Sequence, residues 1–297
     1  MDTLAQPRWM RLISSVFSEN EPATFELVTV QSGARSLRSR ECGETFHPVV
    51  GPMVEAVALH VRQQRLVERA AVAGGTFVIW DVGLGAAANA VAAIDALEMH
   101  VNTSVPIEVH SFDVNDSALR FAVAHAEELE YLVPHVGAVE ELLAQGESVR
   151  GNIHWRLHAG DFHTTMSAAP APHAVLYDPY SPQSNPGMWT LGHFIKLYTR
   201  LSPGVPCLLT NYTRSTAVRV TLLLAGFFVG SGHATGEKDE TTIASNDLAL
   251  LEEPLDTAWL QRVQRSTNGA PLRPEVTRPC AISAEDWQRL VHHPQFA

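Results

Sequence analysis

The sequence lacks the features that would place it in a membrane, in an oxidising compartment or around a metal ion. Its 297 residues include no run of roughly eighteen apolar residues, and residues 1–17 carry too short an apolar stretch for a signal peptide. The three cysteines, Cys42, Cys207 and Cys280, stand far apart, which suggests reduced thiols rather than disulfides or metal ligands. We therefore expect a cytoplasmic protein that does not bind a membrane.

Basic residues are also scarce. The chain has 21 Lys and Arg against 32 Asp and Glu, a formal net charge of −11, which is opposite to the charge expected of a nucleic-acid binder. The 14 histidines show no His-x-x-x-His spacing on a predicted helix, so no metal site is expected. A local basic patch stays compatible with the total charge, although each arginine alone is more simply a solvated surface residue. The candidates for such a patch are Arg35, Arg38, Arg40, Arg200, Arg214 and Arg219.

What the chain does contain is a regular alternation of apolar strands and amphipathic helices. With 45% hydrophobic residues, it can bury a full α/β core. The last two predicted strands are joined by a loop rather than by a helix, which favours the Rossmann-like, doubly wound sheet of a class I methyltransferase. An antiparallel last strand inserted in the sheet would distinguish this fold from an all-parallel dehydrogenase. The predicted strands are residues 77–80, 107–112, 154–157, 174–177, 205–209, 226–230 and 241–245.

Segments outside this alternation suggest three parts. Residues 1–46 form an N-terminal extension in which 24–30 and 36–40 are predicted to pair as a β-hairpin. Residues 47–246 form the main domain, and residues 247–297 form a proline-rich tail that packs on it. Within these parts, a helix is predicted over 47–71, with Val54 facing the core and Gln63 facing water, and another over 284–290.

A strand, a glycine turn and a helix follow one another in FVIWDVGLGAAANAVAAIDAL, residues 77–97. Gly83 and Gly85 permit a tight turn and a close approach of a ligand to the backbone, with the start of the helix behind it. A glycine pair alone is weak evidence, because many such turns contain one for packing reasons. The acidic residues at the ends of the next strands decide which ligand suits this turn.

Asp113 follows the strand 107–112, where a carboxylate can accept both hydroxyls of a ribose. Asp161 follows the strand 154–157 through Gly160, where a carboxylate can accept from an adenine amino group. No Arg or Lys follows the glycine turn to grip a phosphate, and no Gly-Lys-Ser/Thr occurs. This set suits S-adenosylmethionine better than a phosphorylated cofactor.

The segment AVLYDPYSPQSNPGMWT, residues 174–190, places a carboxylate at the same edge. Asp178 comes directly after an apolar strand, and Pro179, Pro182 and Pro186 stiffen the loop that follows. Open α/β sheets bind ligands at the carboxyl ends of their strands. A rigid loop therefore holds the Asp178 carboxylate at this edge, as a reacting centre would need.

Several segments together resemble the methyltransferase domain of the MnmC family, whose bifunctional members act in tRNA 5-methylaminomethyl-2-thiouridine biosynthesis. These are FHPVVGPMVEAV (46–57), DVGLGAAAN (81–89) and DPYSPQSNPGMW (178–189), in this order. TNYTRSTAVRVTLLLAGFFV (210–229) resembles the next strand and helix of that family. The resemblance covers residues 22–245, and its most specific part is the Asp-x-x-x-Pro-x-x-Asn-Pro-x-Met-Trp string.

The resemblance implies methylation of 5-aminomethyluridine to 5-methylaminomethyluridine at the tRNA wobble position, with S-adenosyl-L-methionine as cofactor and without the FAD oxidase half. Tyr180 and Trp189 are candidates for stacking on the extruded base, although core packing is the simpler explanation for Trp189. For this reaction, Asp178 is predicted to accept a hydrogen bond from the acceptor amine and to orient its lone pair toward the methyl group. The predicted site residues are Asp178 as the catalytic residue, Asp81, Gly83, Gly85, Asn89, Asp113 and Asp161 at the cofactor, and His47, Tyr180 and Trp189 in the substrate pocket.

The chain departs from the family pattern at two places. Asp81 and Ala87 stand where the family usually has Glu and the last Gly of Glu-x-Gly-x-Gly-x-Gly-Leu-Asn. Alanine is a small change if residue 87 is already helical. Asp178 is followed by Pro-Tyr-Ser-Pro, where the family has Gly-Phe-Ala-Pro, which changes the fine shape of the acceptor pocket.

Alternatives remain open from the sequence. A methyltransferase of the same fold that acts on a small amine or another non-tRNA acceptor would agree with the acidic charge. A binding module with decayed catalysis and, more weakly, a nicotinamide dehydrogenase are further possibilities. The sequence leaves the oligomeric state undetermined.

Overall fold

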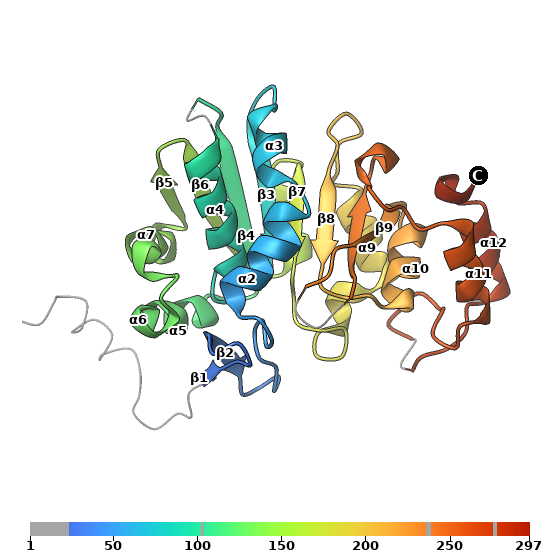
Figure 1. Cartoon of the computed structure of the whole chain (residues 1–297), viewed down its shortest axis with the longest axis horizontal. Coiled ribbons are helices and arrows are strands. Elements are labelled where there is room, and N and C mark those ends of the chain that lie inside the picture. Colours follow the sequence, from blue (N-terminus) through green and yellow to red (C-terminus); the bar gives the residue numbers. More distant parts are fainter. Residues whose placement is uncertain (1–23, 102–103, 236–238, 276–277) are drawn as a thin grey trace, which may run out of the picture.

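The computed structural model describes residues 24–101, 104–235, 239–275 and 278–297; the part of the predicted extension before residue 24 lies outside this range. Within the described residues, a sheet of eight strands runs through the molecule (Figure 1). In spatial order, the strands are β5 (Glu147–Arg150), β6 (Ile153–Ala159), β4 (Ile107–Asp113), β3 (Phe77–Val82), β7 (Ala174–Tyr177), β8 (Leu208–Asn211), β10 (Thr241–Ser245) and β9 (Phe228–Gly232).

The direction of the last strand distinguishes the two fold classes considered from the sequence. Strands β6, β4, β3, β7 and β8 are parallel, whereas β10 lies between β8 and β9 and is antiparallel to both. This is the inserted antiparallel strand that was predicted for a methyltransferase and not for a dehydrogenase. The predicted Rossmann-like fold of class I methyltransferases is confirmed.

Helices cover both faces of the sheet because neighbouring strand residues point to opposite sides. Ile79 packs with the helices of one face and Trp80 with those of the other, and both side chains are buried. On the Ile79 side lie α2 (Pro52–Ala56), η1 (Val57–Arg62), α3 (Leu66–Ala71), α4 (Ala88–His100), α5 (Ser117–Ala124), α6 (Ala126–Leu129) and α7 (Val136–Gln145). On the Trp80 side lie α8 (Phe162–Thr165), α9 (Leu191–Tyr198), α10 (Thr216–Leu224), α11 (Thr257–Arg265) and α12 (Ala284–Val291).

Two strands begin later than the sequence suggested. The strand predicted at 205–209 starts at Leu208, since Val205 N–H closes a turn on Ser202 O and Pro206 has no N–H to pair. The strand predicted at 226–230 starts at Phe228, since Phe227 N–H bonds back to Leu222 O at the end of α10. Hydrogen bonds in the preceding turns therefore prevent both strands from starting earlier in the chain.

The prediction of a single helix over residues 47–71 is wrong. The helix begins at Pro52, passes through the π-helical segment η1 and is interrupted at Arg65, whose φ is 48°. A π turn shifts side chains away from the 3.6-residue period. As a result Val54 is 62% exposed, whereas Gln63 is buried and its Oε1 accepts hydrogen bonds from Thr241 and His233.

The terminal parts agree with their predicted elements. Strands β1 (Phe25–Thr29) and β2 (Arg35–Ser39) pair as the predicted antiparallel hairpin, which lies below α2 in Figure 1. In the tail, α12 matches the helix predicted at 284–290, and Trp259 of α11 and Leu290 of α12 are buried in the same core as α9 and α10. The division of the chain at residues 46 and 246 stays a prediction.

The described residues contain no group of His, Cys, Asp or Glu side chains arranged to hold a metal ion. Across the same residues, no helix combines the length and the apolar character that a membrane crossing requires. Cys42, Cys207 and Cys280 are all free thiols.

Candidate active site

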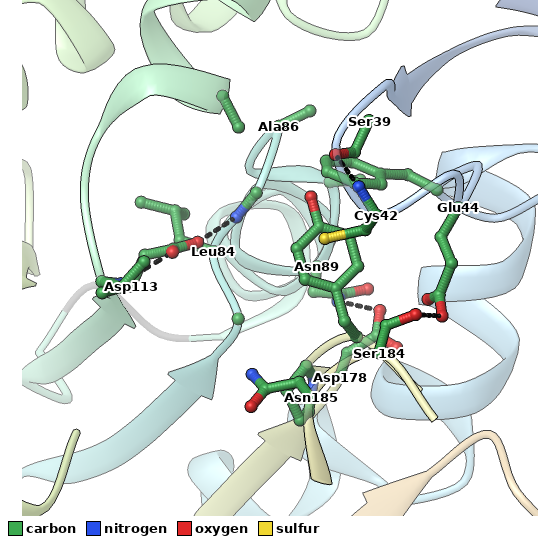
Figure 2. A pocket seen from close by; sticks show the side chains of 18 of the residues that line it. Ser39, Cys42, Glu44, Leu84, Ala86, Asn89, Asp113, Asp178, Ser184 and Asn185 are labelled. Carbon is green, nitrogen blue, oxygen red and sulfur yellow. Dashed lines mark hydrogen bonds between the residues drawn. The ribbon is translucent and has the colours of Figure 1, made fainter. Parts of the chain in front are cut away.

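A cavity of about 820 Å³ lies at the carboxyl ends of β3, β4 and β7 (Figure 2). Its wall is formed by the turn after β3, by Asp113 at the end of β4, by the loop after β7 and by the segment that follows the β1–β2 hairpin. Parallel strands bring their carboxyl ends to one edge of a sheet, which is why segments distant in sequence meet here. All the predicted site residues except Asp81 and Trp189 line this cavity.

The turn after β3 requires its two glycines. Gly83 has a φ of 92°, and a Cβ there would lie 2.7 Å from the carbonyl oxygen of Asp178. Gly85 has a φ of 51°, and its Cβ would lie 3.0 Å from the ring of Phe46. Only glycine allows this backbone to run so close to both neighbours.

Ala87 is not helical. It precedes α4 in the left-handed conformation, with φ 64° and ψ 13°, and its side chain is fully buried. For a residue with a Cβ this conformation costs on the order of 1 kcal/mol, which a glycine would avoid. Alanine at position 87 was expected to be a small change only if this residue were helical, and it is not.

Asp113 supports the glycine turn from the neighbouring strand. Its Oδ2 accepts a 2.9 Å hydrogen bond from Gly85 N–H, and its Oδ1 accepts a 2.7 Å bond from Val114 N–H. Burial raises the pKa of Asp113 despite these backbone donors. The carboxylate thus lies beside the turn, where the sequence predicted contacts to a ribose.

Asp161 lies on the wall near the start of α8. Its Oδ1 caps the helix by accepting from the N–H and the hydroxyl of Thr164, each at 3.1 Å. Burial opposes ionisation, but the hydrogen bonds from Thr164 outweigh it and lower the pKa of Asp161. The side chain is therefore an ionised acceptor at the cavity, as the predicted adenine contact requires.

Asp178 is fixed to the turn and to the helix that follows it. Its backbone N–H donates to Val82 O at 2.9 Å, and its Oδ2 accepts a 2.8 Å hydrogen bond from Nδ2 of Asn89. Figure 2 shows this bond between Asn89 and Asp178, with Asp113 on the other side of the glycine turn. Asn89 was predicted to contact the cofactor, which stays a prediction; the structure shows that it bonds to the loop carboxylate.

Asp81 lies behind the cavity rather than on its wall. It is fully buried in β3, and its Oδ2 accepts a 2.8 Å hydrogen bond from the Ser111 hydroxyl. Burial raises the pKa of Asp81 to about 7, and the charges of Asp178 and Asp113 act in the same direction. The structure gives Asp81 no direct access to a ligand in this cavity.

The three predicted pocket residues differ in position. His47 and Tyr180 line the cavity, and the Tyr180 ring meets Phe46 edge-on with 5.6 Å between centroids. Trp189 is fully buried, and its Nε1–H donates to Tyr180 O at 2.8 Å. Core packing thus explains Trp189, whose ring supports the loop and is not available to stack on a base.

Three carboxylates of the wall, Glu41, Glu44 and Glu55, were not predicted from the sequence. Glu44 accepts hydrogen bonds from the Ser181 hydroxyl and, at 3.2 Å, from Ser181 N–H. It also accepts one from the Ser184 hydroxyl (Figure 2). It therefore joins the segment after the hairpin to the loop that follows β7. Nothing in the local sequence signals this contact, because the partners come from distant segments.

The wall is acidic. Among the described residues that line the cavity there is no Lys or Arg, which excludes a grip on phosphates by basic side chains and suits a sulfonium cofactor and a cationic amine. The glycine turn, which a Cβ would fill, and the acceptors at Asp113 and Asp161 fit S-adenosyl-L-methionine. The lining carboxylates are Glu41, Glu44, Glu55, Asp113, Asp161 and Asp178.

Similarities to known proteins agree with this chemistry. A family model described as S-adenosyl-L-methionine-dependent methyltransferase matches residues 124–247, from the end of α5 to just beyond β10. The tRNA 5-methylaminomethyl-2-thiouridine biosynthesis bifunctional protein MnmC of Ectopseudomonas mendocina is 28% identical over 239 residues, which are 75% of this chain and 35% of that protein. The protein of the same name from Ralstonia nicotianae is 32% identical over 179 residues, 58% of this chain and 24% of that protein.

The chain thus spans about a third or less of the length of these curated relatives. A crystal structure of MnmC2 from Aquifex aeolicus has the same fold, with a TM-score of 0.68 and 23% identity, over 92% of this chain and 84% of that one. These similarities confirm the resemblance seen in the sequence, the predicted class of enzyme and its predicted cofactor.

Proposed function

We propose that this chain, which is an S-adenosyl-L-methionine-dependent methyltransferase, methylates the amine of 5-aminomethyluridine at the tRNA wobble position to give 5-methylaminomethyluridine. The observation that carries the amine acceptor is the Asp178 carboxylate, fixed by Asn89 on the wall of an acidic cavity beside the glycine turn. The tRNA acceptor is supported by the names of the curated relatives. A cytoplasmic location goes with a tRNA substrate and stays a prediction.

In this proposal each side chain binds or orients a reactant. S-adenosyl-L-methionine supplies a methyl group on a sulfonium, which a neutral amine attacks by direct displacement. Asp113 accepts from the ribose hydroxyls and Asp161 from the adenine amino group, while Gly83 and Gly85 let the backbone approach the cofactor. Asp178 accepts from the amine and aligns its lone pair, so that positioning supplies most of the rate enhancement.

Several of the six arginines considered for a tRNA patch have acidic partners within the chain. Arg38 on β2 and Arg40, which follows the end of β2, are half-exposed, but both pair with Glu26, at 3.7 and 3.1 Å. Arg219 is buried, and its guanidinium bonds to Glu240, Thr242 and the carbonyl of Thr241, which assigns it to the core. These arginines already have partners within the chain, and the described residues of the cavity wall include no Lys or Arg. Both observations favour a small amine as the second candidate acceptor.

Calorimetric titration with S-adenosyl-L-methionine, followed by methyl transfer to tRNA that lacks the modification, tests this function. Micromolar binding that is lost in Asp113→Ala, with label entering tRNA, is the expected result. Asp178→Asn is expected to keep cofactor binding and to lower kcat at least about 100-fold. If labelled methyl groups enter small alkylamines but not tRNA, a small amine replaces tRNA as the proposed acceptor. If the protein does not bind S-adenosyl-L-methionine, the proposed function is overturned.

A further inference from the structure

His47 lies between two carboxylates that come from different parts of the chain. Its Nε2 is 3.8 Å from Oδ2 of Asp178, in the loop after β7, and its Nδ1 is 3.7 Å from Oε2 of Glu55, in α2. The same Oδ2 of Asp178 accepts the hydrogen bond from Asn89. All four residues line the cavity, so the imidazole connects its central carboxylate to a second one.

The backbone at His47 is strained. Its φ is 46°, and the next residue is Pro48, which further restricts the preceding residue. Such a conformation costs on the order of 1 kcal/mol and persists only where the surroundings impose it. Here Phe46 N–H donates to Leu37 O at 2.8 Å and the Ser36 hydroxyl donates to Phe46 O, so β2 holds the segment in place. The strain accompanies a placement of the ring between two acids.

The charges around the ring favour its protonated form. Burial lowers the pKa of His47, but Glu55, Asp178 and the deeper Asp81 outweigh burial, and the net result is a raised pKa. The neighbouring His60 in η1 has a pKa of about 3 because of burial, so it is neutral and adds no charge. His47 thus holds a proton more tightly than a free imidazole does, and its Nε2 lies 3.8 Å from the proposed catalytic carboxylate.

We propose that His47 takes up, by way of Asp178, the proton that the acceptor ammonium must lose before methyl transfer, and that Glu55 orients the imidazole for this role. This inference rests on the proposed function, because it requires an amine acceptor bound at Asp178. His47 acts through Asp178 and is a positioning and proton-accepting residue that does not itself touch the amine.

The primary ammonium gives one proton to the Asp178 carboxylate, which passes it to neutral Nε2 of His47. The free lone pair on nitrogen then forms the N–C bond while the electron pair of the C–S bond returns to sulfur. The sulfonium becomes a thioether and the amine a secondary ammonium, and the imidazolium releases its proton to water before the next turnover.

Titration of the imidazole by NMR, on protein without cofactor or acceptor, tests the arrangement itself. In the wild type, His47 is expected to titrate above pH 6.5. In Glu55→Gln and in Asp178→Asn its midpoint is expected to fall by about one unit, because an opposite charge is lost. A midpoint at or below 6.5 in the wild type, or one unchanged in Glu55→Gln, overturns the inference.

The dependence of kcat/KM on pH, measured with unmodified tRNA or with a small amine, tests the proton route. In the wild type, the ascending limb of the kcat/KM profile is expected at the pH of the His47 NMR midpoint. In Glu55→Gln, the limb and the midpoint are expected to move together. In His47→Gln this limb is lost and kcat falls about 10- to 100-fold. A matched control is His233→Gln, which removes a histidine 3.5 Å from Glu252, exposed and outside the cavity.

These outcomes separate the two proposals. If the wild type methylates an amine and His47→Gln keeps the same limb, the proton route is wrong and the proposed function stands. If the wild type methylates no amine, the proposed function fails and the proton route with it. If His47→Gln does not fold, the coupled shifts of the NMR midpoint and the limb in Glu55→Gln decide the matter.

Discussion

Nδ2 of Asn89 donates a 2.8 Å hydrogen bond to Oδ2 of Asp178, which ties the first turn of α4 to the loop after β7. Asn89 is 3% exposed, so water does not readily replace this bond. The helix that follows the predicted cofactor turn therefore positions the carboxylate predicted to face the acceptor.

Replacing Asn89 by Ala is expected to lower kcat about tenfold, because a hydrogen bond to a charged group contributes about 1.5–3 kcal/mol to holding Asp178. Steady-state kinetics with the methyl acceptor provide the measurement, and circular dichroism verifies the fold. Asn268→Ala, outside the cavity, is the control and keeps the wild-type rate. An Asn89→Ala enzyme with full kcat would mean that Asp178 needs no such support.

Gly83→Ala and Gly146→Ala form a matched pair. Both glycines have a positive φ, 92° and 81°, so each alanine is expected to cost about 1–2 kcal/mol of folding free energy. A Cβ at Gly146 meets nothing within 4 Å, whereas one at Gly83 overlaps the carbonyl of Asp178. Denaturant unfolding is expected to show both losses, and only Gly83→Ala is expected to lose activity, by at least tenfold. Equal activity of the two variants would contradict the close approach.

Glu44→Gln is expected to destabilise the loop that carries Ser181 and Ser184. Burial raises the pKa of Glu44, but its bonds from these serines outweigh burial and lower it. The stabilisation is therefore present above the unfolded pKa and is lost as the pH falls through the folded pKa. Melting temperatures are expected to differ between wild type and variant at pH 7 and to converge near pH 3. The loss at pH 7 is about 1–2 kcal/mol, and a difference that persists in acid would refute a role for the charge.

Asp81→Asn is expected to show the opposite dependence on pH. The pKa of Asp81 is raised to about 7 in the folded protein, so its stabilising contribution is present below the unfolded pKa and is lost as the pH rises through 7. Relative to the wild type, Asp81→Asn is expected to gain stability between pH 4 and pH 8, by on the order of 3 kcal/mol. Urea unfolding at several pH values measures it, and parallel curves for the two proteins would show that Asp81 is ionised throughout.

Local patterns in the chain predict the framework of the site. Strand β7 and strand β10 have the residues expected from their apolar runs, and Asp113 and Asp178 stand at the carboxyl ends of β4 and β7. Such features depend on the side chains of consecutive residues and on glycine, which act within one segment. The helix around η1 escaped prediction because its π turn breaks the period on which the pattern relies.

The sequence by itself determined the doubly wound sheet, the glycine turn and the arrival of acidic residues at one edge, because each follows from spacing within a short segment. Only the tertiary structure decided that His47 lies between Asp178 and Glu55, that Glu44 holds the loop after β7, and that Trp189 packs in the core. These relationships join segments far apart in the chain. They arise when helices and loops pack on the sheet, and no local preference of the backbone encodes them.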